Sequence, residues 1–228
     1  GRTIFRYWTQ GYKKAIYDSR ILTTKHIVNA LGEGRGQTLL TTSAVGIYGD
    51  AGDRILTETD NPGSGFLSSV CRDWENEGDK VREKDVRVCV MRFGVVLGHG
   101  GALTKMLPAF RMFLGGPLGS GQQWFPWIHI QDIFGGVRFL IDNETLDGPF
   151  NFTAPMPLKQ KDFAKALGSV LGRPAFFPAP GVLVRTVMGE MGRAFLESQR
   201  AEPARLTENG YRFLFPAIDE ALEDLVGR

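Results

Sequence analysis

The chain has 228 residues, of which 43% are hydrophobic, and its 27 basic and 25 acidic residues leave a formal charge of only +2. This length and composition suit a globular protein with one substantial core, or one core and a small second module. Because the charges are scattered and form no basic run, the sequence predicts no nucleic-acid partner.

No apolar run reaches the ~18 residues of a membrane span, and the opening segment GRTIFRYWTQ lacks the charged-then-apolar order of a signal peptide. The two cysteines, Cys71 and Cys89, fall in a helix-like and a strand-like segment. They predict buried thiols in a reducing compartment rather than a disulfide or a metal pair. We therefore expect a cytoplasmic protein with no metal site and no membrane partner.

Helix-like and strand-like segments alternate along the chain. Helices are predicted from apolar spacing over 12–31, 67–74, 102–114, 130–142 and 161–172. Strands are predicted over 38–42, 86–98 and 148–153. Pro108 is expected to bend or break the third helix. Strands separated by helices predict an α/β fold, with a parallel sheet and helices on both of its faces.

The ends of the predicted strands are candidates for a ligand site. Ligands of an open parallel sheet bind beyond the carboxyl ends of its strands, where the connecting loops converge. These ends read TTSAVG, RFGVVLG and NFTAP, and all three are rich in small residues. Small residues let a flat ring lie close to the backbone, although glycine and serine also simply terminate strands. By themselves, the strand ends leave both interpretations open.

Six segments together are more specific: RYWTQGYKKAIYDSRILTTKHIVNAL, TTSAVGIYGD, RFGVVLGHGGAL, LGGPLGSGQQWFPWIHIQDI, GPFNFTAP and ESQRAEPARLTENGYRFLFPAIDEAL. In this order they resemble the extended short-chain dehydrogenase/reductase superfamily, and within it the atypical NAD-dependent, sugar-nucleotide epimerase-like group. The resemblance implies a Rossmann-like sheet that binds NADP, with NAD as the alternative, and a small-molecule substrate. It makes no prediction about the oligomeric state.

The resemblance also implies a division of the chain. Residues 1–157 correspond to the remaining C-terminal half of the dinucleotide-binding domain, with a substrate-side insertion at about 101–128. Residues 158–228 correspond to a small C-terminal helical module. No G-x-G-x-x-G motif for a pyrophosphate occurs at a strand-to-helix turn. We therefore expect the N-terminal half of the family's Rossmann domain to be missing from this sequence.

Catalytic residues follow from the same resemblance. Ser43 matches the strand-end residue that orients a substrate hydroxyl or carbonyl. The family's Tyr-x-x-x-Lys positions hold Leu67 and Cys71, and neither leucine nor an uncharged thiol can replace a tyrosine activated by a lysine. Tyr48 and Arg20 lie in segments expected to face the nicotinamide. We predict that Ser43 positions the reacting oxygen, that Tyr48 or a water moves the proton, and that Arg20 orients an anionic or polar group.

Binding residues are expected at the strand ends and after a glycine-rich loop. The predicted cofactor contacts are Thr42, Ser43, Ala44, Arg92, Gly94, Val95 and Val96. The predicted substrate contacts are Gln122, Gln123, Trp124 and Trp127. Alternatives stay open at several positions: Arg92 could tie loops together, the tryptophans could pack in the core, and His129 and Asp132 could serve the entry of a helix.

Two functions are consistent with these residues, and a third interpretation, a purely structural subunit of a larger assembly, makes no prediction about the ligand site. The first is hydride transfer on a carbonyl or hydroxyl of a small or nucleotide-sugar-like substrate. The alternative is a catalytically inactive dinucleotide-binding sensor or scaffold. The lost Tyr and Lys favour the alternative, whereas the retained Ser43 and the polar, glycine-rich strand ends favour the enzyme.

Overall fold

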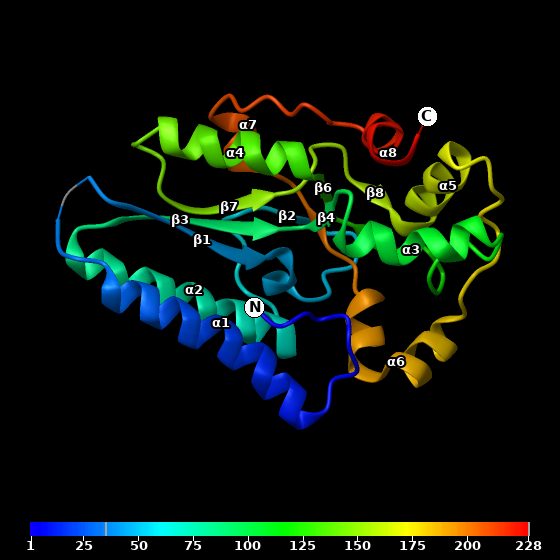
Figure 1. Cartoon of the computed structure of the whole chain (residues 1–228), viewed down its shortest axis with the longest axis horizontal. Coiled ribbons are helices and arrows are strands. Elements are labelled where there is room, and N and C mark those ends of the chain that lie inside the picture. Colours follow the sequence, from blue (N-terminus) through cyan, green and yellow to red (C-terminus); the bar gives the residue numbers. More distant parts are fainter. Residues whose placement is uncertain (35, 228) are drawn as a thin grey trace.

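A parallel sheet of three strands forms the centre of the computed structural model, which describes residues 1–34 and 36–227. The strands are β1 (Thr38–Ala44), β3 (Arg87–Phe93) and β7 (Gly148–Phe152), in the order β1-β3-β7. Helices α1 (Gln10–Ala30) and α2 (Phe66–Asp79) cover one face, and α4 (Ile130–Asp142) covers the other (Figure 1). This arrangement confirms the predicted α/β fold with helices on both faces of a Rossmann-like sheet.

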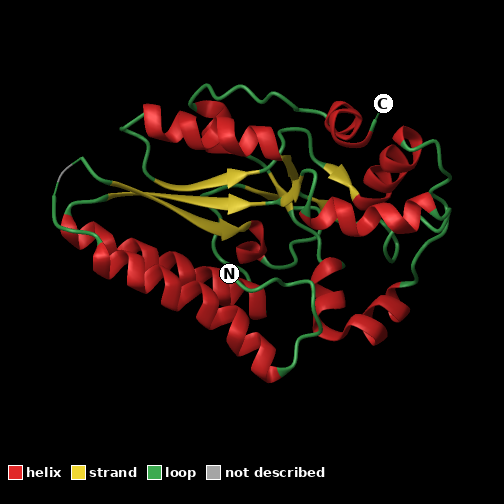
Figure 2. Cartoon of the chain, viewed as in Figure 1, coloured by secondary structure: helices red, strands yellow, loops and turns green. Residues whose placement is uncertain are grey.

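The remaining helices and strands connect or extend this sheet. They are η1 (Val45–Tyr48), β2 (Ile55–Leu56), η2 (Lys80–Lys84), β4 (Val95–Leu97), α3 (Gly101–Arg111), β5 (Trp124–Phe125), β6 (Trp127–His129), β8 (Leu158–Lys159), α5 (Gln160–Val170), α6 (Gly181–Phe195), β9 (Arg200–Ala201), α7 (Ala204–Glu208) and α8 (Ile218–Val226). Helices α3, α5, α6 and α8 gather beyond the carboxyl ends of the central strands (Figure 2). No helix in the described ranges is long and apolar enough to cross a membrane.

The central strand β3 is buried on both sides. Val88 and Val90 pack toward one face, whereas Cys89 and Met91 pack in a second cluster with residues of α4 and β7. The alternation seen in the sequence therefore reflects two apolar faces, as expected for a parallel strand covered on both sides. Cys89 and Cys71 are both free and buried, which confirms the prediction of separate buried thiols.

The sequence-based boundaries are wrong at two places. The strand predicted over 86–98 breaks at Gly94, and β4 leaves the central sheet to pair in parallel with β6. The backbones approach so closely there that a Cβ on Gly94 would lie 2.9 Å from the carbonyl oxygen of Pro126. Helix α3 continues past Pro108 to Arg111, so the expected break does not occur there, and the expected bend stays a prediction.

A second core lies beyond the strand ends. Leu103 of α3, Trp127 of β6, Phe163 of α5 and Leu222 of α8 belong to one buried cluster. The segment predicted as a substrate-side insertion therefore shares its core with the C-terminal helices. The division at residues 157 and 158 stays a prediction.

Candidate functional site

Three polar residues form a row across the carboxyl ends of the central strands. Ser43 of β1 is the register partner of Arg92 of β3, and Arg92 is the partner of Asn151 of β7. All three residues are buried. Parallel pairing thus brings together two residues that the sequence singled out and a third, Asn151, that it missed.

Arg92 is fully engaged with other protein groups. Its Nε and Nη2 donate to the two carboxylate oxygens of Glu75 on α2, at 3.0 and 2.8 Å. Its Nη1 donates to the hydroxyl of Tyr48 at 2.9 Å. Burial acts to lower the pKa of Arg92, but the hydrogen bond and charge of Glu75 and the neighbouring Tyr48 outweigh it and raise the pKa overall. The structure gives Arg92 a part in joining β3 to α2, and its predicted contact with a cofactor stays a prediction.

Tyr48 lies at the end of η1, with its hydroxyl inside this network. The hydroxyl donates to Asn151 Oδ1 at 2.8 Å and accepts from Arg92. Burial raises the pKa of Tyr48 to about 12, although the Arg92 guanidinium acts in the opposite direction. Both hydrogen-bonding positions of the phenol are therefore used within the protein. The proton-transfer role predicted for Tyr48 stays a prediction, and this geometry weighs against direct contact with a substrate.

Asn151 and a buried carboxylate anchor the C-terminal segment to the strand ends. Glu58 Oε1 accepts the backbone N–H of Asn151 at 2.8 Å, and both Glu58 oxygens accept the N–H of Arg205 at 3.3 Å. Asn151 also donates to the carbonyl of Glu202 at 2.9 Å. Burial raises the pKa of Glu58. No local motif signals these partners, because they are separated by up to about 150 residues in the sequence.

Ser43 differs from its neighbours in the row. Only 3% of this residue is exposed, and its Oγ makes no well-formed hydrogen bond to any residue in the described ranges. The polar group opposite it on α2 is the thiol of Cys71; burial raises the pKa of this thiol to about 11, and its weak interaction with the Ser43 hydroxyl acts in the opposite direction. A thiol is a weak hydrogen-bond partner. Ser43 is thus a strand-end hydroxyl whose hydrogen-bonding capacity the protein leaves largely unused.

Arg20 of α1 supplies a positive charge near Cys71. Its guanidinium donates to the carbonyl of Ile16 at 3.0 Å and lies 5.4 Å from the ring centroid of Trp74 on α2. Burial lowers the pKa of Arg20, and the neighbouring Cys71 acts in the opposite direction. Arg20 is therefore not on a fully solvated face. It faces the position at which the family carries its lysine, and its catalytic role stays a prediction.

The other predicted cofactor contacts lie beside Ser43 on β1 and on β4, which follows β3 in the chain. Thr42 and Ala44 are half-buried at the end of β1, and Val95 and Val96 are half-buried on β4. Gly94 has a second reason to be glycine, namely the close approach of Pro126 described above. The structure thus places these residues at neighbouring strand ends, and their contacts with a cofactor remain to be tested.

The four predicted substrate contacts divide into two groups. Gln123 is buried and donates to the carbonyl of Leu118 at 3.0 Å, and Trp127 lies in the second core. Gln122 is exposed and Trp124 is half-buried. The packing alternative thus describes the surroundings of Trp127, whereas Gln122 and Trp124 keep exposed surface, and their contacts with a substrate stay a prediction.

Three charged residues contact Trp124. Its indole Nε1 donates to Asp53 Oδ1 at 2.7 Å, and the cationic groups of Lys159 and Arg200 lie 5.1 and 4.6 Å from its ring centroid. Lys159 also pairs with Asp53 at 2.9 Å. The ring is therefore fixed where the loop after η1 meets the antiparallel pair of β5 and β8.

His129 and Asp132 support the structure at the start of α4. His129 Nδ1 accepts the N–H of Gln131 and caps the helix. The buried carboxylate of Asp132 accepts the N–H groups of Leu214 and Phe215, at 2.7 and 3.0 Å. The helix-entry interpretation is confirmed for His129. Asp132 has a different structural role, because its carboxylate fixes the C-terminal tail to α4, which the sequence did not predict.

Two family descriptions match the sequence. The NAD dependent epimerase/dehydratase family matches residues 6–151, and a domain of unknown function, DUF1731, matches residues 179–225. A relative from Arabidopsis thaliana, the chloroplastic epimerase family protein SDR39U1 homolog, is 40% identical over 99% of this chain and 66% of its own length. The epimerase family protein YfhF of Bacillus subtilis is 35% identical over 99% of this chain and 76% of its own length. The chain thus spans about two thirds to three quarters of these relatives.

Solved structures agree with this relationship. Human epimerase family protein SDR39U1, crystallised with NADPH, superposes with a TM-score of 0.93 at 33% identity, covering 99% of this chain and 79% of that one. A nucleoside-diphosphate sugar epimerase from Corynebacterium glutamicum gives a TM-score of 0.77 at 34% identity, over 97% of this chain and 44% of that one. The predicted resemblance to the extended, epimerase-like dehydrogenase/reductases is confirmed, and the chain belongs to the NAD dependent epimerase/dehydratase family.

Proposed function

We propose that this protein is an NADP(H)-dependent oxidoreductase that transfers hydride to a carbonyl, or from a hydroxyl, of a small or nucleotide-sugar-like substrate. The observation that carries the proposal is the Ser43 hydroxyl, which is buried at the carboxyl end of β1 without a well-formed hydrogen bond to the described residues. A buried hydroxyl without a partner costs free energy. A substrate oxygen bound at this strand end would supply the missing partner.

The residues around Ser43 fit the nicotinamide end of a dinucleotide. Ala44 follows Ser43 on β1, and Val95 and Val96 lie on β4 just after the end of β3; all three are half-buried and offer small or apolar surface. Bound NADP(H) would supply the hydride at this place. The human relative that was crystallised with NADPH supports the choice of cofactor, and NAD is the alternative.

Ser43 and Arg20 have different parts in this proposal. Ser43 donates a hydrogen bond that positions the reacting oxygen. Arg20 contributes a fixed positive charge from α1, where α2 offers only the uncharged Cys71. A fixed charge close to an oxygen that becomes negative stabilises the transition state more than the ground state.

The experiment uses NADPH fluorescence titration together with NADPH oxidation by a panel of quinones, aldehydes and keto-sugars. We expect micromolar NADPH binding, and we expect Ser43→Ala to lower turnover about 100-fold with little change in NADPH affinity. Ser169→Ala, which removes an exposed hydroxyl of α5, is the matched control. Turnover by Ser43→Ala equal to that of the control would remove Ser43 from the mechanism.

The non-catalytic alternative has its own support. Leu67 and Cys71 occupy the Tyr and Lys positions, and the Tyr48 hydroxyl is engaged by Arg92 and Asn151. A sensor or scaffold would bind NADPH without oxidising it with any member of the panel. That result would favour this second function over the first.

A further inference from the structure

Helices α1 and α2 pack side by side and run in the same direction (Figure 1). The hydroxyl of Tyr17 bonds to Asp73 at 3.1 Å, and the indole of Trp74 bonds to Thr24 at 2.8 Å. These contacts set the register in which Arg20 faces Cys71. Any residue two turns before Arg20 on the same side of α1 therefore lies next to the first turn of α2.

Lys13 occupies this place, seven residues before Arg20. Its Nζ lies 4.7 Å from the ring centroid of Phe66, which precedes Leu67 at the family's tyrosine position. Arg20 likewise lies near Cys71, the residue at the family's lysine position. Helix α1 thus carries one cation at the first turn of α2, over the residue that precedes Leu67, and a second cation near Cys71.

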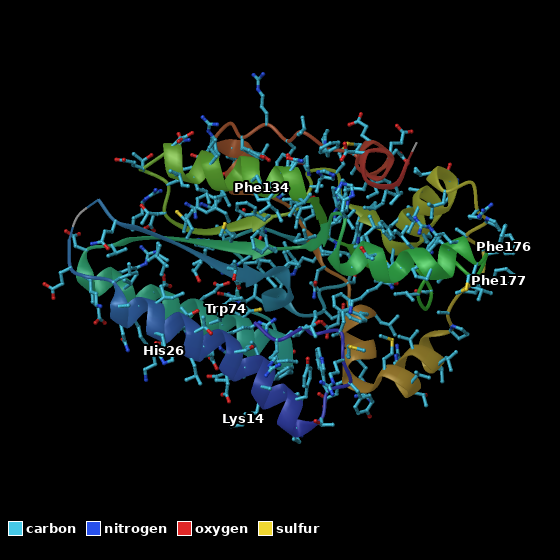
Figure 3. All side chains as sticks on the ribbon, in the orientation of Figure 1. Lys14, His26, Trp74, Phe134, Phe176 and Phe177 are labelled. Carbon is cyan, nitrogen blue, oxygen red and sulfur yellow. The ribbon has the colours of Figure 1, made fainter. Side chains whose placement is uncertain are left out.

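The Lys13 side chain is held in place from another element. Its ammonium pairs with Glu190 Oε2 of α6 at 2.7 Å, and only 19% of the side chain is exposed. Lys14, the next residue, is 75% exposed and points away from the molecule (Figure 3). Two adjacent lysines therefore differ sharply, since one is positioned at a junction of three helices and the other is solvated.

Apolar groups surround the Lys13 junction. Trp8, Ile16 and Met191 form a buried cluster, and the partly buried Phe66 and Leu67 pack against it. Apolar surroundings strengthen hydrogen bonds and charge interactions. Glu190 is 49% exposed, so this partner of Lys13 can be replaced without unfolding a core.

We propose that Lys13 is a catalytic residue that contacts the reacting oxygen in place of the family's tyrosine, and that Glu190 is its positioning residue. The inference rests on the proposed function. In the reducing direction the substrate carbonyl carbon accepts a hydride from NADPH, which is oxidised to NADP⁺, and the C–O π electrons move to the oxygen. The oxygen then takes a proton from the Lys13 ammonium, and the resulting amine regains a proton from water.

The first test compares Lys13→Met with the neighbouring control Lys14→Met. The probe is phenanthrenequinone reduction, and the dissociation constant of NADPH is measured in parallel. We expect Lys13→Met to lower kcat about 100-fold with NADPH affinity unchanged, Lys13→Arg to recover part of this loss, and Lys14→Met to stay within about twofold of wild type. Equal kcat values for the two methionine variants would overturn the role of Lys13.

Glu190 has a matched control in Asp18, the partner of Lys14. We expect Glu190→Gln to lower kcat about fivefold to tenfold, since Lys13 keeps its charge but loses its orientation, and Asp18→Asn to change nothing. Unchanged unfolding midpoints in both variants exclude a general loss of structure. A kcat for Glu190→Gln equal to that of Asp18→Asn would overturn its positioning role.

A second readout does not depend on turnover. Lysines are dimethylated with ¹³C-labelled formaldehyde, and the NMR signals of their methyl groups are recorded. The signals of Lys13 and Lys14 are assigned by their loss in Lys13→Arg and Lys14→Arg. We expect phenanthrenequinone, added with NADP⁺, to shift the Lys13 signal and leave the Lys14 signal in place. Equal behaviour of the two signals would overturn the contact between Lys13 and ligand.

Failure of the two proposals can be told apart. A wild-type protein that binds no NADPH, or that oxidises none with the whole panel, removes the proposed function and the role of Lys13 with it. A wild-type protein that turns over, combined with a Lys13→Met variant that behaves like Lys14→Met, removes the role of Lys13 alone.

Discussion

Helices α1 and α2 lie on the same face of the sheet and differ in what they present to the strand ends. On helix α2 the family resemblance assigns Leu67 and Cys71 to the reactive positions, and Glu75 holds Arg92. Helix α1 places the cation of Arg20 near Cys71 and that of Lys13 over the ring of Phe66. The comparison teaches that the loss of a motif from one helix does not by itself exclude a reaction at the strand ends, because the neighbouring parallel helix can supply positive charge there.

The largest expected effect tests whether the ion pair between Arg92 of β3 and Glu75 of α2 holds the fold together. Arg92→Met leaves the carboxylate of Glu75 buried without its partner, and we expect a loss of about 3–5 kcal/mol in the free energy of unfolding. Urea unfolding measures it. Arg138→Met, which removes an exposed ion pair with Asp142, should change stability by less than about 0.5 kcal/mol. A loss below about 1 kcal/mol for Arg92→Met would contradict the structural role.

Restoring a lysine on α2 should fail while Arg20 remains on α1. Cys71→Lys buries an ammonium beside the Arg20 guanidinium, and we expect it to cost about 3 kcal/mol of stability. Removing the second cation, in Arg20→Met/Cys71→Lys, should recover about 1 kcal/mol. Asn76→Lys, at an exposed position of α2, is the control. If the stability loss of the double variant equals the sum of the losses for Arg20→Met and Cys71→Lys, positions 20 and 71 do not interact.

The charge of Arg20 should matter more for turnover than for stability. We expect Arg20→Gln to lower kcat/KM about tenfold, equivalent to about 1.4 kcal/mol of transition-state stabilisation. Arg20→Lys should keep part of the activity. Steady-state oxidation of NADPH measures the effect, with the exposed Arg72→Gln as the control. Equal kcat/KM values for Arg20→Gln and Arg72→Gln would contradict a role of the Arg20 charge in turnover.

The smallest effect concerns Glu197, which follows α6. Burial and the nearby Asp50 raise its pKa to about 7, from an ordinary value of 4.5. Between pH 4.5 and about 7 the Glu197 carboxyl holds a proton in the folded state and has released it in the unfolded state. The contribution of Glu197 to the free energy of unfolding therefore falls as the pH rises through this range. We expect Glu197→Gln to stabilise the protein by about 1 kcal/mol near pH 8 and not near pH 4.

Thermal unfolding of Glu197→Gln at both pH values measures this difference. Glu144→Gln, at an exposed position after α4, is the control and should show no such pH dependence. A stabilisation that is the same at both pH values would show that the carboxyl of Glu197 is not the group that titrates.

Much of the fold follows from local patterns. The periodic apolar residues of α2, α4 and α5 predict helices near their observed ranges, and three parallel strands are predicted correctly. The break at Gly94 could not be predicted, because its cause is the approach of Pro126, which lies 32 residues later in the chain. The helical continuation through Pro108 depends on where α3 ends, which apolar spacing does not fix.

The candidate site shows the same limit. Ser43 is recognisable from its place at a strand end, and Arg20 from its type and helix. Glu58 and Asn151 are not recognisable, since their partners come from distant segments. Lys13 has no local feature that distinguishes it from Lys14, and only the packing of α6 separates the two.

By itself, the sequence determined the α/β class, the order of the elements, the family and the absence of tyrosine and lysine from α2, because these depend on local composition and spacing. The tertiary structure alone decided which side chains share the space beyond the strand ends. Hydrogen bonds and ion pairs act over a few ångströms, so the pairing of Arg92 with Glu75, and of Lys13 with Glu190, depends on how α1, α2 and α6 pack together.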